Sequence, residues 1–309
     1  MTKQPGARIG VAAAVVAGAV AVTLVAGGGR SSAEQVRLDH GGTASRAELQ
    51  RVLNAVPAAG AAATRAELEA RGEALFDSSA VAKAGESCVS CHIVGGGVNA
   101  ALGVITHKLE GSRPPTPDNF TGVRDAPALW DVAQTAPYNW VGANKTLEDQ
   151  VTTAITTHFR DEASGVTADR VAAIAAYLRT LRAPTTRHDQ GRLTAEERHG
   201  EELFAGKGGC IACHGGPQFT DDQIHRTDVP QVDVPQLGPG NDPGSSSVPG
   251  GFNTPQLRDV RNTAPYMHNG VFKALEEVVD FYNSNALTGG PLRLTAAEKA
   301  AIVAYLKTL

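Results

Sequence analysis

Apolar residues recur at helical spacing in two segments of the chain, VAAIAAYLRTL at residues 171–181 and AAIVAYLKTL at residues 300–309. Such a period predicts a helix with one buried face. Two more polar segments, AELEARGEALF at 66–76 and AEERHGEELF at 195–204, are also predicted to be helices. No segment alternates convincingly between apolar and polar residues, as a half-buried strand would. The pattern therefore predicts a mainly α fold.

The first 30 residues differ from the rest of the chain. Lys3 and Arg8 precede an uncharged apolar run from Ile9 to Gly29, which is the pattern of an export signal. The run is also long enough to span a bilayer if it stays uncut. We expect residues 1–30 to be a signal peptide or N-terminal anchor and residues 31–64 to be a flexible tether. We therefore expect a periplasmic protein, which would contact the membrane only if its N-terminal segment stays uncut.

An internal repeat follows the tether. Residues 124–151 and 252–279 align without gaps at an offset of 128. The identical pairs include Pro127/Pro255, Asp131/Asp259, Tyr138/Tyr266 and Gly142/Gly270. A repeat of this kind indicates two copies of one structural unit, and 309 residues suffice for two domains. We expect tandem domains at 65–182 and 193–309, a linker at 183–192, and a long surface loop at 229–251.

Composition narrows the functions that the chain can have. The net charge is -4 and no Lys/Arg-rich run is present, so nucleic acid is not an expected partner. All four cysteines lie in two short motifs, which leaves none for a disulfide framework. Aromatic residues make up only 5% of the chain, a thin supply for two apolar cores. A large apolar cofactor in each unit would complete them.

The two cysteine motifs, CVSCH and CIACH, share the pattern C-x-x-C-H. This pattern attaches c-type haem, because both thiols add to the vinyl groups and the histidine binds the iron. A zinc site would need a second cysteine pair nearby, and a redox dithiol needs no following histidine. We expect two covalently bound haem c groups, held by Cys88 and Cys91 with His92 as iron ligand, and by Cys210 and Cys213 with His214.

The remaining haem ligands decide between electron transfer and peroxide chemistry. The chain has only two methionines, and Met1 is remote or removed. Met267 is then the sole methionine that could bind iron through a thioether. Two ordinary electron-transfer haems with His and Met ligands are therefore not expected.

Three further segments follow the first cysteine motif or the second: RDAP (124–127), WVGANKTLEDQ (140–150) and LRDVRNTAPYMHNGVFKALEEVVDFY (257–282). In their sequence and order they resemble segments of the bacterial dihaem cytochrome c peroxidase and MauG family, and the resemblance covers residues 65–309. The resemblance implies two tandem cytochrome c domains, each wrapped around its haem, with a calcium ion between the haems. It also implies an enzyme that uses hydrogen peroxide to form high-valent haem and oxidises a small cytochrome c, a cupredoxin or a protein substrate.

The resemblance assigns roles to residues outside the cysteine motifs. Tyr282 falls where peroxidases place a methionine ligand on the C-terminal haem and MauG places a tyrosine. Met267 or His268 could be the ligand instead, with Tyr282 a packed aromatic residue. Trp140 matches a tryptophan between the two haems, and its alternative is a core tryptophan. Gln150 matches a glutamine of the distal pocket, and its alternative is an exposed helix residue.

One position departs from the family. Arg160 stands where a catalytic glutamate is normal, so His158, or Glu162 after a small change of register, could serve as the acid–base group or as a sixth iron ligand. His107 lies in a glycine-rich loop near the position of a displaceable distal histidine, or is an ordinary surface histidine.

The resemblance also implies calcium ligands at three residues of this chain. Asp125 takes the place of an asparagine, and Thr263 and Pro265 match residues that donate backbone carbonyls to calcium, which prefers oxygen ligands. The alternative for Asp125 is a loop or helix-cap residue.

Two other functions stay open. The first is a MauG-like enzyme that modifies Trp or Tyr in a partner protein, which Tyr282 favours. The second is a dihaem electron carrier without enzymatic activity, which would need both irons to be stably six-coordinate.

Overall fold

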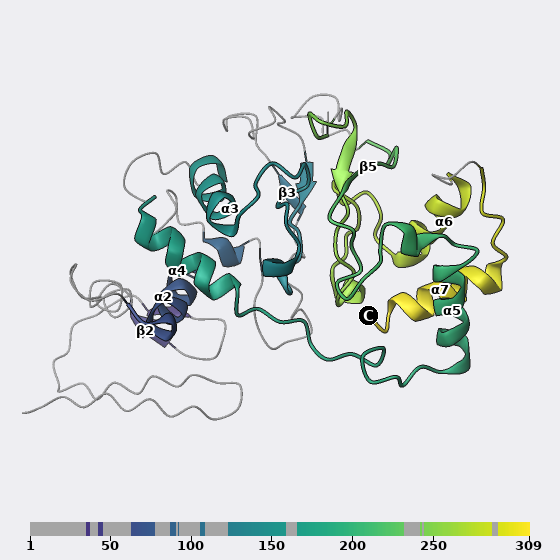
Figure 1. The fold of residues 1–309 in the computed structure, drawn as a ribbon, viewed down its shortest axis with the longest axis horizontal. Helices are drawn as coiled ribbons and strands as arrows, with labels where there is room; N and C mark the ends of the chain where they lie inside the picture. The colour runs from purple at the N-terminus through teal and green to yellow at the C-terminus, as the bar shows by residue number, and fades with distance from the viewer. Residues whose placement is uncertain are drawn as a thin grey trace, which may run out of the picture. The chain divides into compact units, whose positions relative to one another are not determined.

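The computed structural model describes residues 35–37, 43–45, 63–77, 87–90, 92, 106–108, 123–158, 166–231, 242, 244–285 and 290–309 (Figure 1). The apolar N-terminal run lies outside these residues. Within the expected tether, strands β1 (Gln35–Arg37) and β2 (Thr43–Ser45) form an antiparallel pair. None of the helices in the described part of the chain has the length and apolar composition of a membrane-spanning segment.

Helices form most of the regular structure in the described residues. They are α2 (Arg65–Asp77), α3 (Leu147–Thr153), α4 (Ala168–Leu178), α5 (Ala195–Ala205), α6 (Leu275–Ser284) and α7 (Ala296–Leu306). A π-helical turn at Ala154–His158 continues α3. The further strands are antiparallel pairs, β3 (Thr106–Lys108) with β4 (Val123–Asp125) and β5 (Ile224–Arg226) with β6 (Gly251–Asn253). The prediction of a mainly α fold is confirmed.

Helices α4 and α7 start and end a few residues earlier than their apolar patterns predicted. Each begins after a threonine, Thr167 or Thr295, whose hydroxyl accepts the N–H of Arg170 or Glu298 at 3.3 Å. A short polar side chain at this position satisfies a free N–H group of the first turn and starts the helix. The first turn is polar, so the apolar period could not reveal it.

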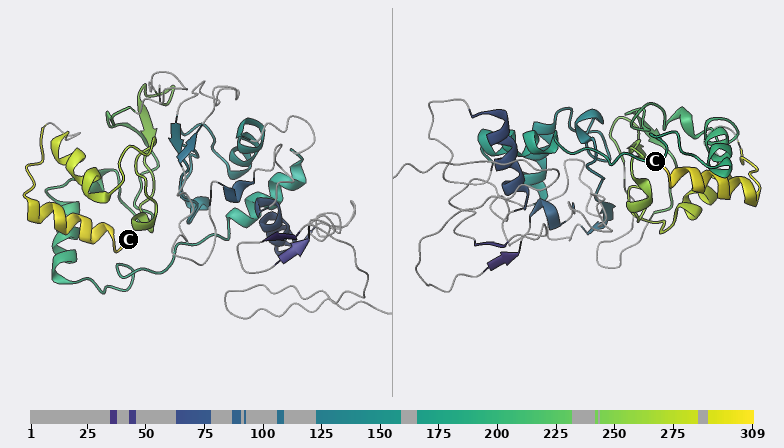
Figure 2. Two further views of the ribbon diagram at one scale, coloured as in Figure 1. Left: turned by 180° about the vertical axis from the view of Figure 1, so that it is seen from behind. Right: turned by 90° about the horizontal axis from the view of Figure 1, so that it is seen from below.

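The repeat extends beyond the aligned segments, because α2 packs on α4 as α5 packs on α7 (Figure 2). Each crossing requires a glycine. A Cβ atom on Gly72 would lie 1.9 Å from the carbonyl oxygen of Ala173, and one on Gly200 would lie 2.0 Å from that of Ala301. The same offset of 128 residues relates the aromatic pairs beside these glycines, each with ring centres 5.4 Å apart: Phe76 with Tyr177, and Phe204 with Tyr305.

Each repeat is closed by one backbone hydrogen bond, and the two bonds are equivalent. The N–H of Asp131 donates to the carbonyl of Leu181 at 3.1 Å, and the N–H of Asp259 donates to that of Leu309 at 3.0 Å. Both aspartates have a positive φ, 48° and 57°. The chain following α4 and α7 is therefore fixed in the same way in both repeats.

Buried apolar residues form two clusters, one in each repeat. The first joins α2, α3 and α4 and includes Leu75 and Ile174, and the second joins α5, α6 and α7 and includes Leu203 and Ile302. Cys88 packs against the first cluster and Cys210 against the second. Each cysteine motif is thus anchored on its own hydrophobic core.

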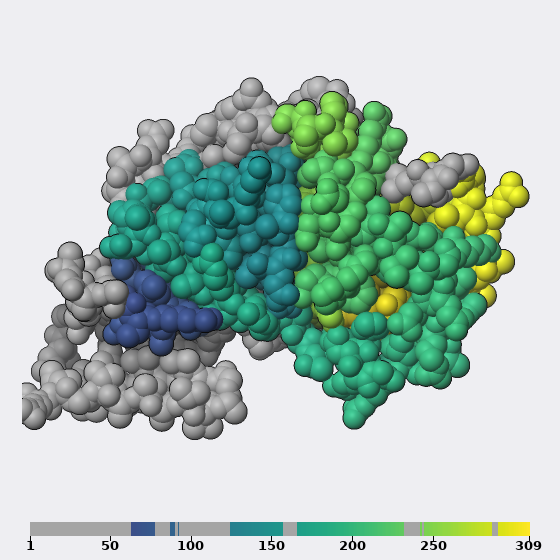
Figure 3. Space-filling model, in the orientation of Figure 1, coloured from purple at the N-terminus to yellow at the C-terminus, as the bar shows by residue number. Residues whose placement is uncertain are grey.

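The two repeats contact each other through buried polar groups, and their atoms meet in Figure 3. Arg124 of β4 donates from Nε and Nη2 to the two carboxylate oxygens of Asp242, at 2.8 and 2.7 Å. The side chain of Asp242 is only 1% exposed. Segment 229–251 was predicted to be a surface loop, and that is wrong at Asp242, Val229 and Ser245, which are buried. The contact between repeats explains the burial of Asp242.

Candidate haem sites

The second cysteine motif folds into a single turn directly after α5. Residues Cys210–Ala212 form a 3₁₀ turn, and the N–H of His214 donates to the carbonyl of Cys210 at 2.8 Å. Burial raises the pKa of the Cys210 thiol to about 11 and also raises that of Cys213. A raised pKa disfavours a redox dithiol, whose nucleophile is a thiolate. The thiols are therefore held protonated beside a histidine.

His214 is oriented by the backbone that follows it. Its Nδ1 lies 2.9 Å from the carbonyl oxygen of Phe219. A carbonyl only accepts, so Nδ1 carries the hydrogen and Nε2 keeps a lone pair. Burial lowers the pKa of His214, which favours the neutral imidazole that metals bind. This donor set fits covalent haem with His214 as the iron ligand.

Tyr282 of α6 lies beside this motif. Burial raises its pKa, and the neighbouring Cys210 and Cys213 thiols raise it further. The alternative ligand His268 has different surroundings. It is 2% exposed, its ring stacks on that of Phe252 with centres 3.6 Å apart, and burial lowers its pKa to about 4. Of these two candidates, Tyr282 is the one that neighbours the second cysteine motif.

Trp140 lies where the two repeats meet. Its indole N–H donates to the carbonyl of Asp125 at 2.7 Å, and its backbone carbonyl accepts from the N–H of Asn253 at 2.7 Å. Its ring meets that of His268 edge-on, with centres 6.4 Å apart. Neither hydrophobic cluster includes Trp140. The alternative of a core tryptophan therefore does not describe its position.

Gln150 of α3 is half-buried, so the alternative of an exposed helix residue is wrong. Its Oε1 accepts from Nδ2 of Asn144 at 2.8 Å and from Nδ2 of Asn139 at 3.4 Å. Because the oxygen takes both bonds, Nε2 is the atom of the carboxamide that can donate to a ligand.

The first cysteine motif repeats the geometry of the second where it is described. Cys88–Ser90 form a 3₁₀ turn, and the N–H of His92 donates to the carbonyl of Cys88 at 2.9 Å. The ring of Phe76 lies 6.4 Å from that of His92 between centres. Cys91 lies outside the described residues.

The acid–base candidates are described only in part. Arg160 and Glu162 lie outside the described residues, and His158 ends the π-helical turn. His107 lies in β3, with Arg124 as its partner in the strand register. The expectation of a loop at His107 is therefore wrong. The side chains of His107 and His158 lie outside the described part of the structure.

Comparison with known proteins relates the whole chain to one group. No model of a protein family matches it. It is 29% identical to the methylamine utilization protein MauG of Methylorubrum extorquens, over 96% of this chain and 92% of that protein. The cytochrome-c peroxidase IdrP2 of Denitromonas iodatirespirans is 36% identical over 172 residues, 43% of this chain and 46% of that protein. The matches to the IdrP peroxidases thus span under half of their length.

A comparison with solved structures also finds a MauG-like protein. A MauG-like protein associated with microbial copper homeostasis has a TM-score of 0.61 and 27% identity, over 82% of this chain and 91% of that one. The chain is therefore similar to MauG over most of its length and to cytochrome-c peroxidases over part of it.

Asp125, which was expected to bind calcium, lies next to the segment that contains the other two expected ligands. Asp125 is buried in β4, so the alternative of a loop or cap residue is wrong. Its N–H donates to the carbonyl of His268 at 2.7 Å, which brings Asp125 next to the segment that contains Thr263 and Pro265. The hydroxyl and the N–H of Thr263 both donate to the carbonyl of Val260, at 3.0 and 3.2 Å.

Sequence reasoning missed two residues beside the second motif. Asp221 and His225 lie near Cys213, with ligand atoms of all three within 4.8 Å of one another. Nε2 of His225 lies 2.7 Å from Oδ2 of Asp221. The segment that contains Asp221 and leads into β5 passes close to the motif. No spacing rule for metal or haem sites predicts that Asp221 and His225 lie near Cys213.

Proposed function

We propose that the chain is an exported dihaem peroxidase, with haem c attached at Cys88 and Cys91 and at Cys210 and Cys213. The observation that carries the proposal is the second motif. Its turn joins both thiols to a neutral His214 whose Nδ1 donates to the carbonyl of Phe219. Domains at 65–182 and 193–309, each wrapped around one haem, are supported by the two hydrophobic clusters.

Haem iron, when bound, supplies the redox chemistry that cleaves the O–O bond of hydrogen peroxide. The chain's residues position the peroxide and move its protons. Gln150 donates from Nε2 to peroxide near the first haem, because its Oε1 is already bonded to two asparagines. His158 or Glu162 takes and returns the proton.

Trp140 is proposed as the route for electrons between the haems. Its support is its contact with both repeats: its indole N–H bonds to Asp125 of the first, and its ring touches His268 of the second. An aromatic ring at this contact shortens the distance that an electron must cross.

Tyr282 is proposed as the sixth ligand of the second haem. Its support is its position beside Cys210 and Cys213, which contribute to its raised pKa. Burial keeps the phenol neutral without a cation, so ferric iron would have to displace its proton. A phenolate ligand at this position would stabilise the ferric state and lower the potential of the haem.

A calcium ion between the repeats is proposed at Asp125 with the carbonyls of Thr263 and Pro265. Its support is the buried position of Asp125 in β4. The N–H of Asp125 donates to the carbonyl of His268, which lies in the same segment as Thr263 and Pro265. The apolar N-terminal run supports export to the periplasm, where a small cytochrome c or a cupredoxin would supply electrons.

A second candidate is a MauG-like enzyme that oxidises Trp or Tyr in a partner protein, favoured by the position of Tyr282. The purified ferric protein tests both functions. We expect one equivalent of hydrogen peroxide to change the haem spectrum, and reduced cytochrome c to restore it. In the second candidate the changed spectrum persists until the partner protein is added. A spectrum that peroxide leaves unaltered would indicate an electron carrier.

A further inference from the structure

The backbone that orients His214 has an unfavourable conformation. Phe219 has a φ of 55°, in the left-handed region that bulky residues avoid. This conformation belongs to a turn in which the N–H of Phe219 donates to the carbonyl of Gly216 at 3.2 Å. The result is a carbonyl 2.9 Å from Nδ1 of His214. Such a conformation persists only where its surroundings hold it.

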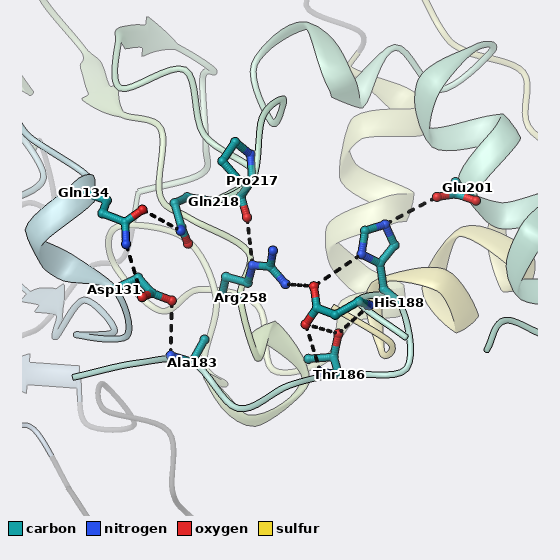
Figure 4. Close-up of polar contacts among 10 residues, drawn as sticks. Asp131, Gln134, Ala183, Thr186, His188, Glu201, Pro217, Gln218 and Arg258 are labelled. Atoms are coloured by element: carbon teal, nitrogen blue, oxygen red, sulfur yellow. Dashed lines mark hydrogen bonds and ion pairs between the residues drawn. The ribbon is translucent and has the colours of Figure 1, made fainter. Parts of the chain in front are cut away.

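Arg258 holds this turn from one side (Figure 4). Its Nε donates to the carbonyl of Pro217 at 2.8 Å. Its guanidinium carbon lies 5.1 Å from the centre of the Phe219 ring, at cation–π distance. The side chain of Arg258 is only 13% exposed. Arg258 thus contacts the turn at two points, the backbone carbonyl of Pro217 and the ring of Phe219.

The linker fixes Arg258 in turn. Nη1 of Arg258 lies 2.5 Å from Oδ1 of Asp189, whose Oδ2 accepts from the N–H and the hydroxyl of Thr186 at 2.9 and 3.0 Å. His188 packs edge-on against the ring of Phe219, with centres 5.3 Å apart. The Phe219 ring therefore has Arg258 and His188 as neighbours, and both are held by chain segments outside the turn.

We propose that Arg258 is a positioning residue for the histidine ligand of the second haem, acting through Pro217 and Phe219. This inference rests on the proposed function, because it concerns how His214 binds iron. A hydrogen bond from the second ring nitrogen fixes the orientation of a histidine ligand and raises its basicity. Arg258 therefore sets the electron donation of His214 to iron, although it touches neither.

The opposing explanation is that Arg258 only fastens the linker to the second repeat. Both explanations predict lower stability when Arg258 is replaced. They differ at the haem, since only a positioning role changes the potential and the ferric spectrum of the second haem. Asp189→Asn separates them further, because it weakens the link to the linker but keeps the contacts of Arg258 with Pro217 and Phe219.

The experiment compares full-length haem-loaded wild type with Arg258→Gln, Arg258→Lys and Asp189→Asn. Arg226→Gln is the control, because Arg226 forms an exposed pair with Asp228. Redox titration followed by visible spectra gives the potential of each haem, and electron paramagnetic resonance gives the ferric signal of the second. For Arg258→Gln we expect about a tenfold rise in the reduced-to-oxidised ratio at fixed potential, 59 mV for one electron.

The other variants separate an effect on the haem potential from an effect on stability. Arg258→Lys keeps the charge but loses the planar fork and the stacking, so it should shift the potential in the same direction by less. Asp189→Asn should lower the unfolding temperature with a smaller shift of potential, and Arg226→Gln should match wild type in both. The potential of the first haem should stay constant throughout.

An Arg258→Gln protein that keeps both haems and the wild-type potential and ferric signal would overturn the inference. If Arg258→Gln does not fold, an unshifted Arg258→Lys protein overturns it equally. A wild type that binds no haem would reject the proposed function itself, which is a separate outcome.

Discussion

Replacing Gly200 by alanine tests how the two repeats are built. Gly200 is buried in the middle of α5, where the helix crosses α7. An added Cβ would lie 2.0 Å from the carbonyl oxygen of Ala301 and 2.8 Å from Cβ of Tyr305. The nearest neighbour is backbone, which cannot rotate away as a flexible side chain could.

The size of the effect follows from two opposing contributions. Ordinary contact begins at 3.4 Å, so the helices would have to separate by about 1.4 Å. Overpacking of this kind costs about 1–3 kcal/mol, and the need to move a helix backbone places the cost near the upper end. Alanine favours a helix over glycine by about 1 kcal/mol. The net loss is about 2 kcal/mol of unfolding free energy.

Thermal unfolding of the haem-loaded protein, followed by circular dichroism, measures this loss. We expect the midpoint of Gly200→Ala to fall by roughly 4–8 °C. Gly72→Ala should behave alike, since its Cβ would lie 1.9 Å from Ala173. Glu202→Ala is the matched control, because its side chain is 78% exposed on the same helix and surface changes stay within about 0.5 kcal/mol.

The sign of the shift decides the outcome. Helix propensity alone would raise the midpoint of Gly200→Ala. A midpoint equal to or above that of wild type would therefore refute the close backbone crossing of α5 and α7.

Three further predictions concern the haem sites and the linker. Tyr282→Phe should raise the potential of the second haem and change its ferric spectrum, and an unaltered spectrum would exclude Tyr282 as ligand. Trp140→Phe should slow electron exchange between the haems after flash reduction, and equal rates would remove it from the route. Burial acts to raise the pKa of Asp189, but Thr186 and Arg258 hold it at about 2, so its stabilisation is present above about pH 4 and fades as pH falls towards 2. In denaturant titrations Asp189→Asn should therefore be less stable than wild type at pH 7 and close to it at pH 2, whereas a constant difference would contradict this pKa.

Much of the architecture is readable from the sequence, because repeated residues have repeated neighbours. The offset found in residues 124–151 also relates Gly72 to Gly200 and Leu181 to Leu309, which lie in equivalent contacts. The starts of α4 and α7 were missed because threonine caps and polar first turns carry no apolar period. The sequence also reveals the cysteine motifs in full, since their chemistry depends on local spacing alone.

Contacts between distant segments could not be predicted in the same way. Asp242 was expected on a surface loop, yet it is buried against Arg124 by the meeting of the two repeats. The role of Phe219 depends on its φ of 55°, and nothing in the residues around it requires that conformation. Arg258 reaches the turn of Phe219 from about 40 residues away in the chain, so its contact with the turn is visible only in three dimensions.

The number of haems bound to each chain shows whether both cysteine motifs carry a covalent haem. An intact mass spectrum of the purified, denatured protein counts only groups that are covalently attached. We predict a mass equal to the polypeptide plus two haems. A mass that corresponds to the bare polypeptide, or to a single attached haem, would rule out a dihaem protein.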